Sequence, residues 1–317
     1  MARNLRRSLV AAAIAMLPAA LVISSATVSD AATAAPAAAF PAHFSAPYLQ
    51  IAGSDAGDLA ADMKASGDKF YTLAFLTSKS GCTLQWEDGG DSVGAFKSQI
   101  SSLQSAGGNV AASFGGAGSK ELAETCTSVS SLAAAYQKVI STYGITRLDF
   151  DIEGNTINNT SATSRRDQAL AQLQKSNSSV QVDFTLPVDP TGLESNATSL
   201  LKDAKSKGVK VSVVNIMTMD FGDGQNALKD AESAAKATHG QLESVFGSSS
   251  AAAWRQLGLT PIAGRNDDNE NFTQSNAKTL ESFAKSNGVG ELAFWEVDQY
   301  DKPLKYAYSK IFNAITG

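Results

Sequence analysis

The sequence Ile-Thr-Arg-Leu-Asp-Phe-Asp-Ile-Glu-Gly at residues 145–154 carries three carboxylates at a spacing of two. Because alternate side chains of a β-strand point to opposite faces, we expect Asp149, Asp151 and Glu153 to share one face. The apolar residues between them then line the other face, as in a strand backed by helices. Like charges at close quarters cannot all ionise freely, so a stack of three acids indicates a functional strand.

Strand-like and helix-like segments alternate along the rest of the chain. Strands are predicted at 48–51, 70–76, 109–113, 146–153, 180–187, 209–219, 257–263 and 291–297, and helices at 93–106, 130–143, 161–176, 195–207, 226–246 and 275–287. Several helices are followed by glycine, a common helix stop, at Gly107, Gly144, Gly208 and Gly288. Eight strands alternating with helices predict a (β/α)8 TIM barrel. The alternative is an open doubly wound sheet, but residues 52–54 make a poor phosphate loop after the first strand.

The first residues have the features of a secretory signal peptide. Residues 1–31 combine an arginine-containing start, an apolar run over 9–23 and small residues before Ala31. The alternative, a membrane anchor, would need a longer apolar run. Residues 32–41 are rich in Ala and Pro and are predicted to be a disordered leader. We therefore expect a secreted, extracellular protein with a catalytic barrel over 42–317.

Composition and charge exclude several classes of protein. The chain has 317 residues, 43% of them hydrophobic and 18% charged, and a net charge of −5. Removal of residues 1–31 takes away three Arg and one Asp, so the mature charge is −5 − 3 + 1 = −7. This acidic chain has no basic patch and is therefore a poor partner for nucleic acid. We expect no association with a membrane, and we expect a monomer.

Cysteine and histidine are scarce. In an exported protein Cys82 and Cys126 are expected to form one disulfide, although two unpaired thiols are the alternative. The closed loop would contribute roughly 3–4 kcal/mol in the chain-entropy picture. With only two histidines, His43 and His239, far apart in sequence, a zinc site, a Ser-His-Asp triad or a Cys-His pair is poorly supported. No metal or cofactor is expected.

The acid-rich strand is the fourth of the eight. Because barrel enzymes place their active site at the C-terminal ends of the strands, Glu153 is expected at the mouth, with Asp151 and then Asp149 in deeper layers. The deep acids would hold or share a proton and leave Glu153 as a general acid of raised pKa. The alternatives are a divalent-cation site and a structural ion-pair cluster, but no EF-hand-like spacing is present.

At this point the chain resembles glycoside hydrolase family 18, the chitinases. Residues 148–153 look like the core of the family's Asp-x-x-Asp-x-Asp-x-Glu signature. Ser113-Phe114-Gly115-Gly116 is similar to its Ser-x-Gly-Gly at the end of strand three. Met217-Thr218-Met219-Asp220 and Phe294-Trp295-Glu296 resemble its motifs at the ends of strands six and eight. Four motifs in the right order cover the chain from about residue 40 to 317.

The resemblance implies a substrate-assisted, retaining hydrolysis in which the acetamido oxygen of the sugar attacks its own anomeric carbon. It implies that Glu153 protonates the leaving oxygen and later activates water, and that Asp151 orients the acetamido group with help from Asp149. Asp220 would help to hold the acetamido group, and Trp295 would form the floor under the sugar. Substrate contacts are also implied near Ser113, Gly115, Gly116 and Met219.

Two positions depart from the family pattern. The signature begins with Asp, but residue 146 is Thr. Met219 stands where most members have a tyrosine that donates a hydrogen bond to the acetamido oxygen, and methionine cannot donate one. Losing one oriented donor typically costs on the order of 10²–10³ in rate, so another donor is needed or the pocket is built differently.

Other mouth residues have two interpretations each. Trp86 is expected either to stack on a sugar ring or to pack in the core, and Tyr300 has the same two alternatives. The loop 265–268 either contacts sugar hydroxyls or is solvated. Asp183 and Asp189 receive no role. The run 115–120 lacks the spacing of a nucleotide-binding loop.

Only a short segment separates Gly264 from Glu291, enough for one helix. The small α+β insertion that walls the cleft in processive family members therefore has no room, and we expect an open groove and endo-type, non-processive attack.

Three functions remain open at the level of sequence. The first is an endochitinase acting on β-1,4-linked N-acetylglucosamine in chitin or its oligosaccharides. The second is an endo-β-N-acetylglucosaminidase acting on N-glycans. The third is a non-catalytic, lectin-like chitin-binding protein. Lectin-like relatives typically lose the terminal Glu, whereas Glu153 is present here.

Overall fold

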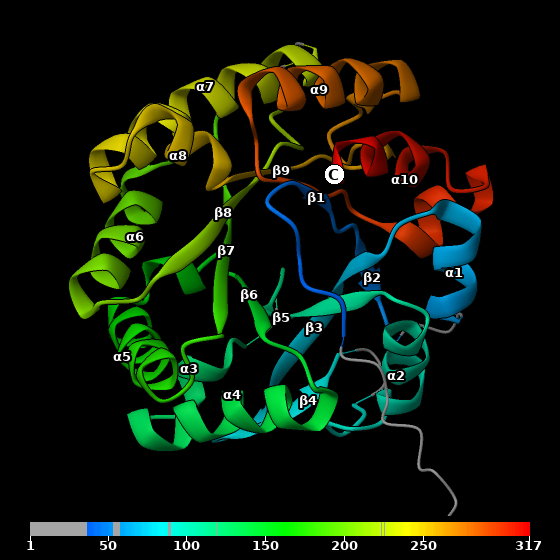
Figure 1. Cartoon of the computed structure of the whole chain (residues 1–317). Helices are drawn as coiled ribbons and strands as arrows, with labels where there is room; N and C mark the ends of the chain where they lie inside the picture. Colours follow the sequence, from blue (N-terminus) through cyan, green and yellow to red (C-terminus); the bar gives the residue numbers. More distant parts are fainter. Residues whose placement is uncertain (1–36, 53–57, 88–89, 119, 223, 225) are drawn as a thin grey trace, which may run out of the picture. The chain divides into compact units, whose positions relative to one another are not determined.

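The computed structural model describes residues 37–52, 58–87, 90–118, 120–222, 224 and 226–317. In this part of the chain, parallel strands surround a central axis and helices surround the strands (Figure 1). The first barrel strand is divided into β1 (Phe44–Ser45) and β2 (Tyr48–Gln50). It is followed by β3 (Phe70–Ser80), β5 (Asn109–Gly115), β6 (Arg147–Asp151), β7 (Gln181–Pro187), β8 (Val211–Met217), β9 (Leu257–Thr260) and β12 (Glu291–Leu292).

The two halves of the first strand close the barrel. β1 pairs in parallel with β12, and β2 pairs in parallel with β3. The backbone amide of Tyr48 also donates to the carbonyl of Phe294, 3.1 Å away. The predicted (β/α)8 barrel is therefore confirmed, with the acid-bearing β6 as its fourth strand.

The helices lie outside the strands (Figure 1). They are α1 (Leu59–Ser66), α2 (Lys97–Ser105), α3 (Leu122–Thr125), α4 (Val129–Tyr143), α5 (Thr160–Ser176), α6 (Ser195–Lys207), α7 (Ala227–Phe246), α8 (Ser250–Arg255), α9 (Gln274–Asn287) and α10 (Ala307–Phe312). As predicted, α4, α6 and α9 end at glycines with positive φ, namely Gly144, Gly208 and Gly288. The short helices α1, α3, α8 and α10 were not predicted, because segments of four to eight residues carry little periodic pattern.

Two hairpins extend the barrel at its mouth. β3 continues past the sheet and turns into the antiparallel β4 (Thr83–Trp86), and β10 (Gly264–Arg265) pairs with β11 (Asn271–Phe272). The segment from Thr260 to Glu291, all of it described, holds only the second hairpin and α9. The predicted absence of an α+β insertion between strands seven and eight is confirmed for this segment.

The two faces of β6 differ as the alternation predicts. On the outward face Phe150 stacks on Phe114 of β5 with ring centroids 5.1 Å apart, and Tyr136 of α4 meets both rings edge-on. All three rings are fully buried between sheet and helices. The inward face carries Arg147, Asp149 and Asp151. The barrel interior is therefore polar along β6, whereas the layer outside the strand is apolar.

The predicted leader departs from expectation at its end. Phe40 packs on Phe70 with centroids 4.6 Å apart and on Phe44 at 5.2 Å, and Asn109 donates to the carbonyl of Ala38 at 2.8 Å. Residues 38–40 are therefore part of the folded barrel rather than of a disordered leader, because an aromatic side chain has apolar surface to bury there. The predicted signal peptide over 1–31, and residues 32–36 of the leader, lie outside the described residues.

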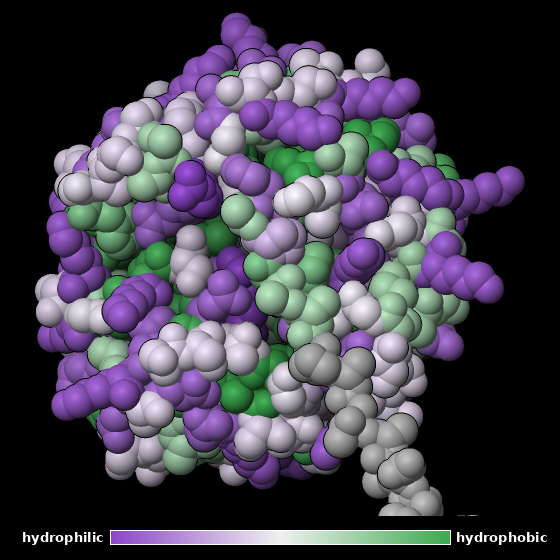
Figure 2. Space-filling view, viewed as in Figure 1, coloured by the Kyte–Doolittle hydropathy of each residue, from purple (hydrophilic) through white to green (hydrophobic). Residues whose placement is uncertain are grey.

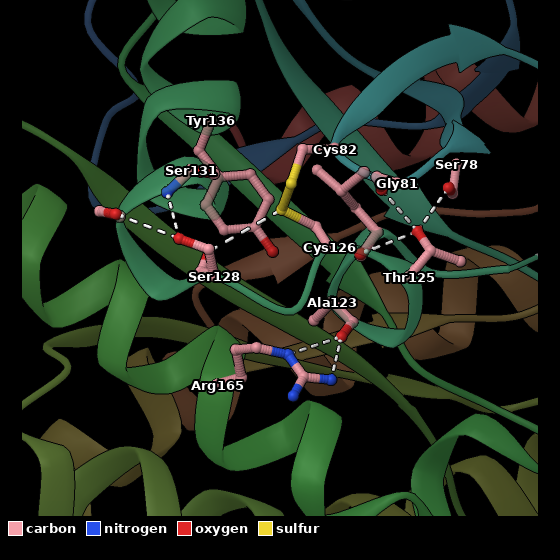
Figure 3. The surroundings of a disulfide bond; sticks show 12 residues. Ser78, Gly81, Cys82, Ala123, Thr125, Cys126, Ser128, Ser131, Tyr136 and Arg165 are labelled. Atoms are coloured by element: carbon pink, nitrogen blue, oxygen red, sulfur yellow. Dashed lines mark hydrogen bonds between the residues drawn. A yellow bond between two sulfur atoms is a disulfide. The ribbon is translucent and has the colours of Figure 1, made fainter.

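A disulfide joins Cys82 to Cys126, as predicted (Figure 3). It links the β3–β4 hairpin to the segment between α3 and α4. Thr125 strengthens the same junction, since its hydroxyl contacts the Ser78 hydroxyl at 2.5 Å and donates to the carbonyl of Gly81 at 2.7 Å. The hairpin beside the mouth is thus fixed to the body of the barrel.

The face of the molecule drawn in Figure 2 is covered largely by hydrophilic residues, with hydrophobic residues in smaller areas between them. Among the described residues, Leu304 is the one large hydrophobic side chain that is exposed. None of the helices in the described part of the chain has the length and apolar character needed to cross a membrane.

Candidate active site

A cavity of about 370 Å³ opens at the C-terminal ends of the strands. It is lined by Tyr48, Gln50, Phe75, Glu87, Ala117, Asp151, Glu153, Thr185, Met217, Met219, Asp220, Thr260, Ile262, Asp267 and Trp295. Five of these side chains carry carboxyl groups, and none of these lining residues is Lys, Arg or His. The cavity is therefore acidic at the place where the sequence predicted an active site.

Asp149 lies beneath the cavity and accepts hydrogen bonds from three hydroxyl groups. Ser113 donates to its Oδ2 at 2.5 Å, Tyr48 to the same oxygen at 3.1 Å, and Thr185 to Oδ1 at 2.8 Å. Burial raises the pKa of Asp149 to about 7, with a further rise from Asp183, while the hydroxyl donors oppose it. The three donors fix the plane of the Asp149 carboxyl group. Asp149 is therefore held rigidly beneath Asp151.

Asp151 is buried and faces the cavity. Only 5% of its surface is exposed, and its Oδ1 has no hydrogen-bond partner among the described residues. Burial raises its pKa well above the ordinary value, and the charges of Glu153 and Asp149 raise it further. Asp151 thus holds its proton more tightly than an ordinary aspartate does, next to the cavity that it lines.

Glu153 lies two residues beyond Asp151, after β6 has ended, and is half-buried at the mouth. The Asp151 carboxyl shares a hydrogen bond with it, which raises the pKa of Asp151 and lowers that of Glu153. Burial nevertheless raises the pKa of Glu153 overall, helped by the charge of Glu87. The predicted order of Glu153, Asp151 and Asp149 from mouth to interior is the observed one, and we call these three residues the acid column.

An aromatic wall faces the acid column. Trp295 stacks on Phe75 with centroids 5.6 Å apart and planes 11° apart, and Tyr48 lies against both rings. The peptide bonds Trp295–Glu296 and Ala74–Phe75 are cis. Trp295 is half-buried and lines the cavity, as predicted, so its exposed surface is available to a flat apolar ligand face.

Asp220 and Met219 both line the cavity, from the loop after β8. Asp220 adopts a positive φ of 50° and its Oδ1 accepts from the amides of Asp267 at 2.7 Å and Asp268 at 3.3 Å. These contacts tie the β8 loop to the loop that precedes β11, and burial raises the pKa of Asp220. Of the predicted loop 265–268, Asp267 reaches the cavity, whereas Arg265 bonds Asn269 instead.

Ser113, Gly115 and Gly116 were predicted to contact substrate, but they are buried and do not line the cavity. Ser113 holds Asp149, as described above. A Cβ on Gly115 would lie 2.1 Å from the Asp151 carbonyl oxygen, and a Cβ on Gly116 would lie 2.7 Å from the Phe75 ring. The Ser-x-Gly-Gly run therefore positions the acids and the aromatic wall, and its contact with substrate stays a prediction.

Trp86 does not bind at the mouth either. It is fully buried, its Nε1 donates to the Tyr143 hydroxyl at 2.8 Å, and its ring packs edge-on against Phe96. The core alternative is correct because β4 turns this side chain toward α2 and α4. Thr146, the departure at the start of the signature, precedes β6, and its carbonyl accepts from Gln181 at 2.8 Å.

Sequence reasoning missed a chain of polar side chains across the barrel. Thr260 donates to the Asn215 carbonyl oxygen at 2.7 Å, Asn215 donates to Thr185 at 3.2 Å, and Tyr48 contacts Thr185 at 2.8 Å. Each residue sits at an inward position of a different strand. Isolated polar residues within otherwise apolar strands were the available signal. Within the described residues, no group of three or more His, Cys, Asp or Glu is arranged to hold a metal ion.

Comparisons with known proteins agree with this geometry. The sequence pattern of the glycosyl hydrolases family 18 matches residues 56–261. The chain is 33% identical to a probable bifunctional chitinase/lysozyme of Escherichia coli (strain K12) over 319 aligned residues, covering 89% of this chain and 35% of that protein. It is 34% identical to endochitinase 11 of Metarhizium anisopliae, covering 83% of this chain and 53% of that protein. The chain thus spans about a third to a half of the curated relatives it matches.

Solved structures are similar over nearly the whole barrel. The catalytic domain of a hyperthermophilic chitinase from Pyrococcus furiosus superposes with a TM-score of 0.81 at 33% identity, covering 88% of this chain and 97% of that one. Catalytic-site mutants of active domain 2 of the Pyrococcus furiosus chitinase, complexed with chito-oligosaccharides, give 0.82 at 32% identity, with 89% and 97% coverage. With a matching family pattern over most of the chain and an acid column at the barrel mouth, this chain belongs to the glycosyl hydrolases family 18.

Proposed function

We propose that the chain is a glycosidase that hydrolyses β-1,4-linked N-acetylglucosamine polymers, chitin and its oligosaccharides, by substrate-assisted, retaining hydrolysis. One observation carries the proposal. Glu153 stands at the mouth of an acidic cavity, hydrogen-bonded to the buried Asp151. A carboxyl of raised pKa above a second carboxyl is the arrangement that a general acid needs near neutral pH.

The roles follow from the positions. Glu153 gives its proton to the glycosidic oxygen, because it is the half-buried acid nearest to solvent. The free Oδ1 of Asp151 accepts from the acetamido N–H and orients the acetamido oxygen toward the anomeric carbon. As positive charge develops on the sugar, Asp151 passes its proton to Asp149 and is left negatively charged beneath the sugar. Glu153, now deprotonated, takes a proton from the water that opens the cyclic intermediate.

The walls of the cavity suit a sugar. Half-buried Trp295 offers an apolar face to the C–H surface of a pyranose ring, while Asp220 and Asp267 offer acceptors to hydroxyl and amide groups. Since only a two-stranded hairpin and α9 lie between β9 and β12, the cleft has low walls on that side. We therefore propose endo-type, non-processive attack. The signal-peptide features of residues 1–31 support secretion, and we propose that the protein acts as a monomer.

The test uses a fluorogenic chitooligosaccharide and a panel of chitin, chitosan and a high-mannose glycoprotein. Wild type should release the fluorophore, and Glu153→Gln should lower kcat by at least about 10³-fold while oligosaccharide binding is retained. Glu124→Gln, an acid on the nearby α3, is the control and should keep wild-type activity. Binding without turnover by wild type would refute the enzyme, and cleavage of the glycoprotein but not chitin would favour an N-glycan substrate.

A further inference from the structure

A second group of charged side chains lies in the barrel below Asp149. Arg147 of β6 and Asp183 of β7 form two hydrogen bonds, Nε to Oδ2 at 2.5 Å and Nη2 to Oδ1 at 3.1 Å. Their side chains are only 3% and 4% exposed. Glu291 of β12 is also buried and interacts with both charges. None of these residues lines the cavity, and none takes part in the mechanism proposed above.

Strand register places Asp183 next to Asp149. In the β6–β7 pairing Asp149 stands opposite Asp183, and Arg147 stands one inward position below Asp149. The rings of Phe40 and Phe44 lie 4.8 and 4.5 Å from the guanidinium carbon and cover it from below. The two rings therefore shield the ion pair from water. Away from water, charge interactions are stronger.

The groups that face Asp149 are nearly all acidic or neutral. From β2 it meets Tyr48, from β5 Ser113, from β6 Asp151, from β7 Asp183 and Thr185, and from β12 Glu291. Among the described residues that enter these interactions, Arg147 is the one cation. It contacts Asp183 rather than Asp149, so any influence on the acid column passes through Asp183.

We propose that Arg147 is a positioning residue for hydrolysis, which neutralises Asp183 beneath Asp149 and so sets how readily the acid column carries a negative charge. The inference rests on the proposed function. Burial raises the pKa of Asp183, and the guanidinium opposes that rise by compensating the carboxylate charge at contact distance. Without the guanidinium, Asp149 and the three buried acids that face it compete for ionisation, and the column keeps its proton to higher pH.

Substitutions of Arg147 and of Asp183 should shift the pKa of Asp149 in opposite directions. Arg147→Met removes the cation that compensates Asp183 and should raise the pKa of Asp149, which stands at about 7 in the intact protein. Asp183→Asn removes a neighbouring negative charge, leaves the guanidinium and should lower that pKa. A purely structural ion pair predicts loss of stability for both variants with no opposed shifts.

The experiment measures kcat/KM against pH on a soluble fluorogenic chitooligosaccharide. We expect the acid limb to move up by about one pH unit in Arg147→Met, down by about one unit in Asp183→Asn, and back toward wild type in the double variant. Lys285→Met, which removes the exposed partner of Glu281 on α9, is the control and should leave the profile unchanged. Shifts of the same sign, or no shift, overturn the proposal.

Two further variants and one further measurement keep the test decisive. The charge of Glu291 also acts on Asp149, so Asp183→Asn with Glu291→Gln should give the largest downward shift. If Arg147→Met does not fold, the near-isosteric Asp183→Asn carries the test by itself. Titration of the Asp149 carboxyl carbon by ¹³C NMR gives the same opposed shifts without turnover. An inactive wild type would then refute the proposed function, whereas unshifted titrations would refute the role of Arg147.

Discussion

Two sets of buried acids in this molecule show how similar charges serve different ends. The acid column runs from the barrel interior up to the cavity at the mouth. The second set, Glu121 and Asp167 around Arg166, lies outside the sheet between the β5 loop and α5. Burial raises the pKa of Glu121 and raises that of Asp167 to about 8, much as it does for the acid column.

The difference lies in what surrounds each set. Arg166 is 3.5 Å from Glu121 and 3.8 Å from Asp167, and all three side chains are at most 1% exposed. Asp151, in contrast, lines a cavity, and no Lys, Arg or His is among the residues that line it. A raised pKa therefore reports burial in both places, and a ligand-sized space beside the acid distinguishes the functional set.

The largest expected effect tests this distinction on activity. Asp151→Asn keeps the shape of the side chain but removes the charge that would stabilise the developing cation, so kcat should fall by about 10³-fold. Glu121→Gln, the matched change in the outer set, should leave kcat within about twofold, since that acid reaches no ligand. Steady-state kinetics of purified, folded variants measure both, and comparable losses would erase the contrast.

The acid column and its depth order could be predicted because a period of two on one strand fixes both. The (β/α)8 barrel could be predicted because eight strand-like segments alternate with helix-like segments along the chain. Trp86 could not be assigned, since whether an aromatic side chain faces the mouth or the core depends on the β3–β4 hairpin. The role of Ser113 was also hidden, because its contact with Asp149 depends on the register between β5 and β6.

Arg147 and Asp183 show the same limit. In the sequence they are 36 residues apart, and nothing local identifies them as partners. Only the pairing of β6 with β7 brings them together. Local alternation thus predicts which residues face inward, whereas contacts between strands determine what each inward residue does.

The second effect tests the outer set on stability. Arg166→Met leaves Glu121 buried without a counter-ion, and breaking a buried pair by removing one partner typically costs about 3–5 kcal/mol. Urea unfolding at neutral pH should show this loss, while kcat of the protein that remains folded should stay near wild type. A stable Arg166→Met with reduced kcat would place the outer set in the active site after all.

The third effect separates the two sets by pH. The pKa of Asp167 is about 8 in the folded protein, against about 4 in an unfolded chain. Above pH 4 the unfolded chain therefore releases a proton that the folded protein retains, so stability should fall as pH rises toward 8. Asp167→Asn should flatten the decline in Tm between pH 5 and 8 without moving the pH profile of kcat/KM. A steeper decline would contradict this assignment.

The smallest effect sharpens the comparison at the cavity rim. The charge of Glu87 raises the pKa of Glu153, after burial itself. Glu87→Gln should lower that pKa, so Glu153 loses its proton at a lower pH and the basic limb of kcat/KM moves down by a few tenths of a unit. On the acid limb of the pH profile, kcat/KM of Glu87→Gln should change little. Glu124→Gln, which removes an acid that binds Thr156 outside the cavity, should move neither limb. An upward shift in Glu87→Gln would mean that this side chain acts on the acid column by contact and not by charge.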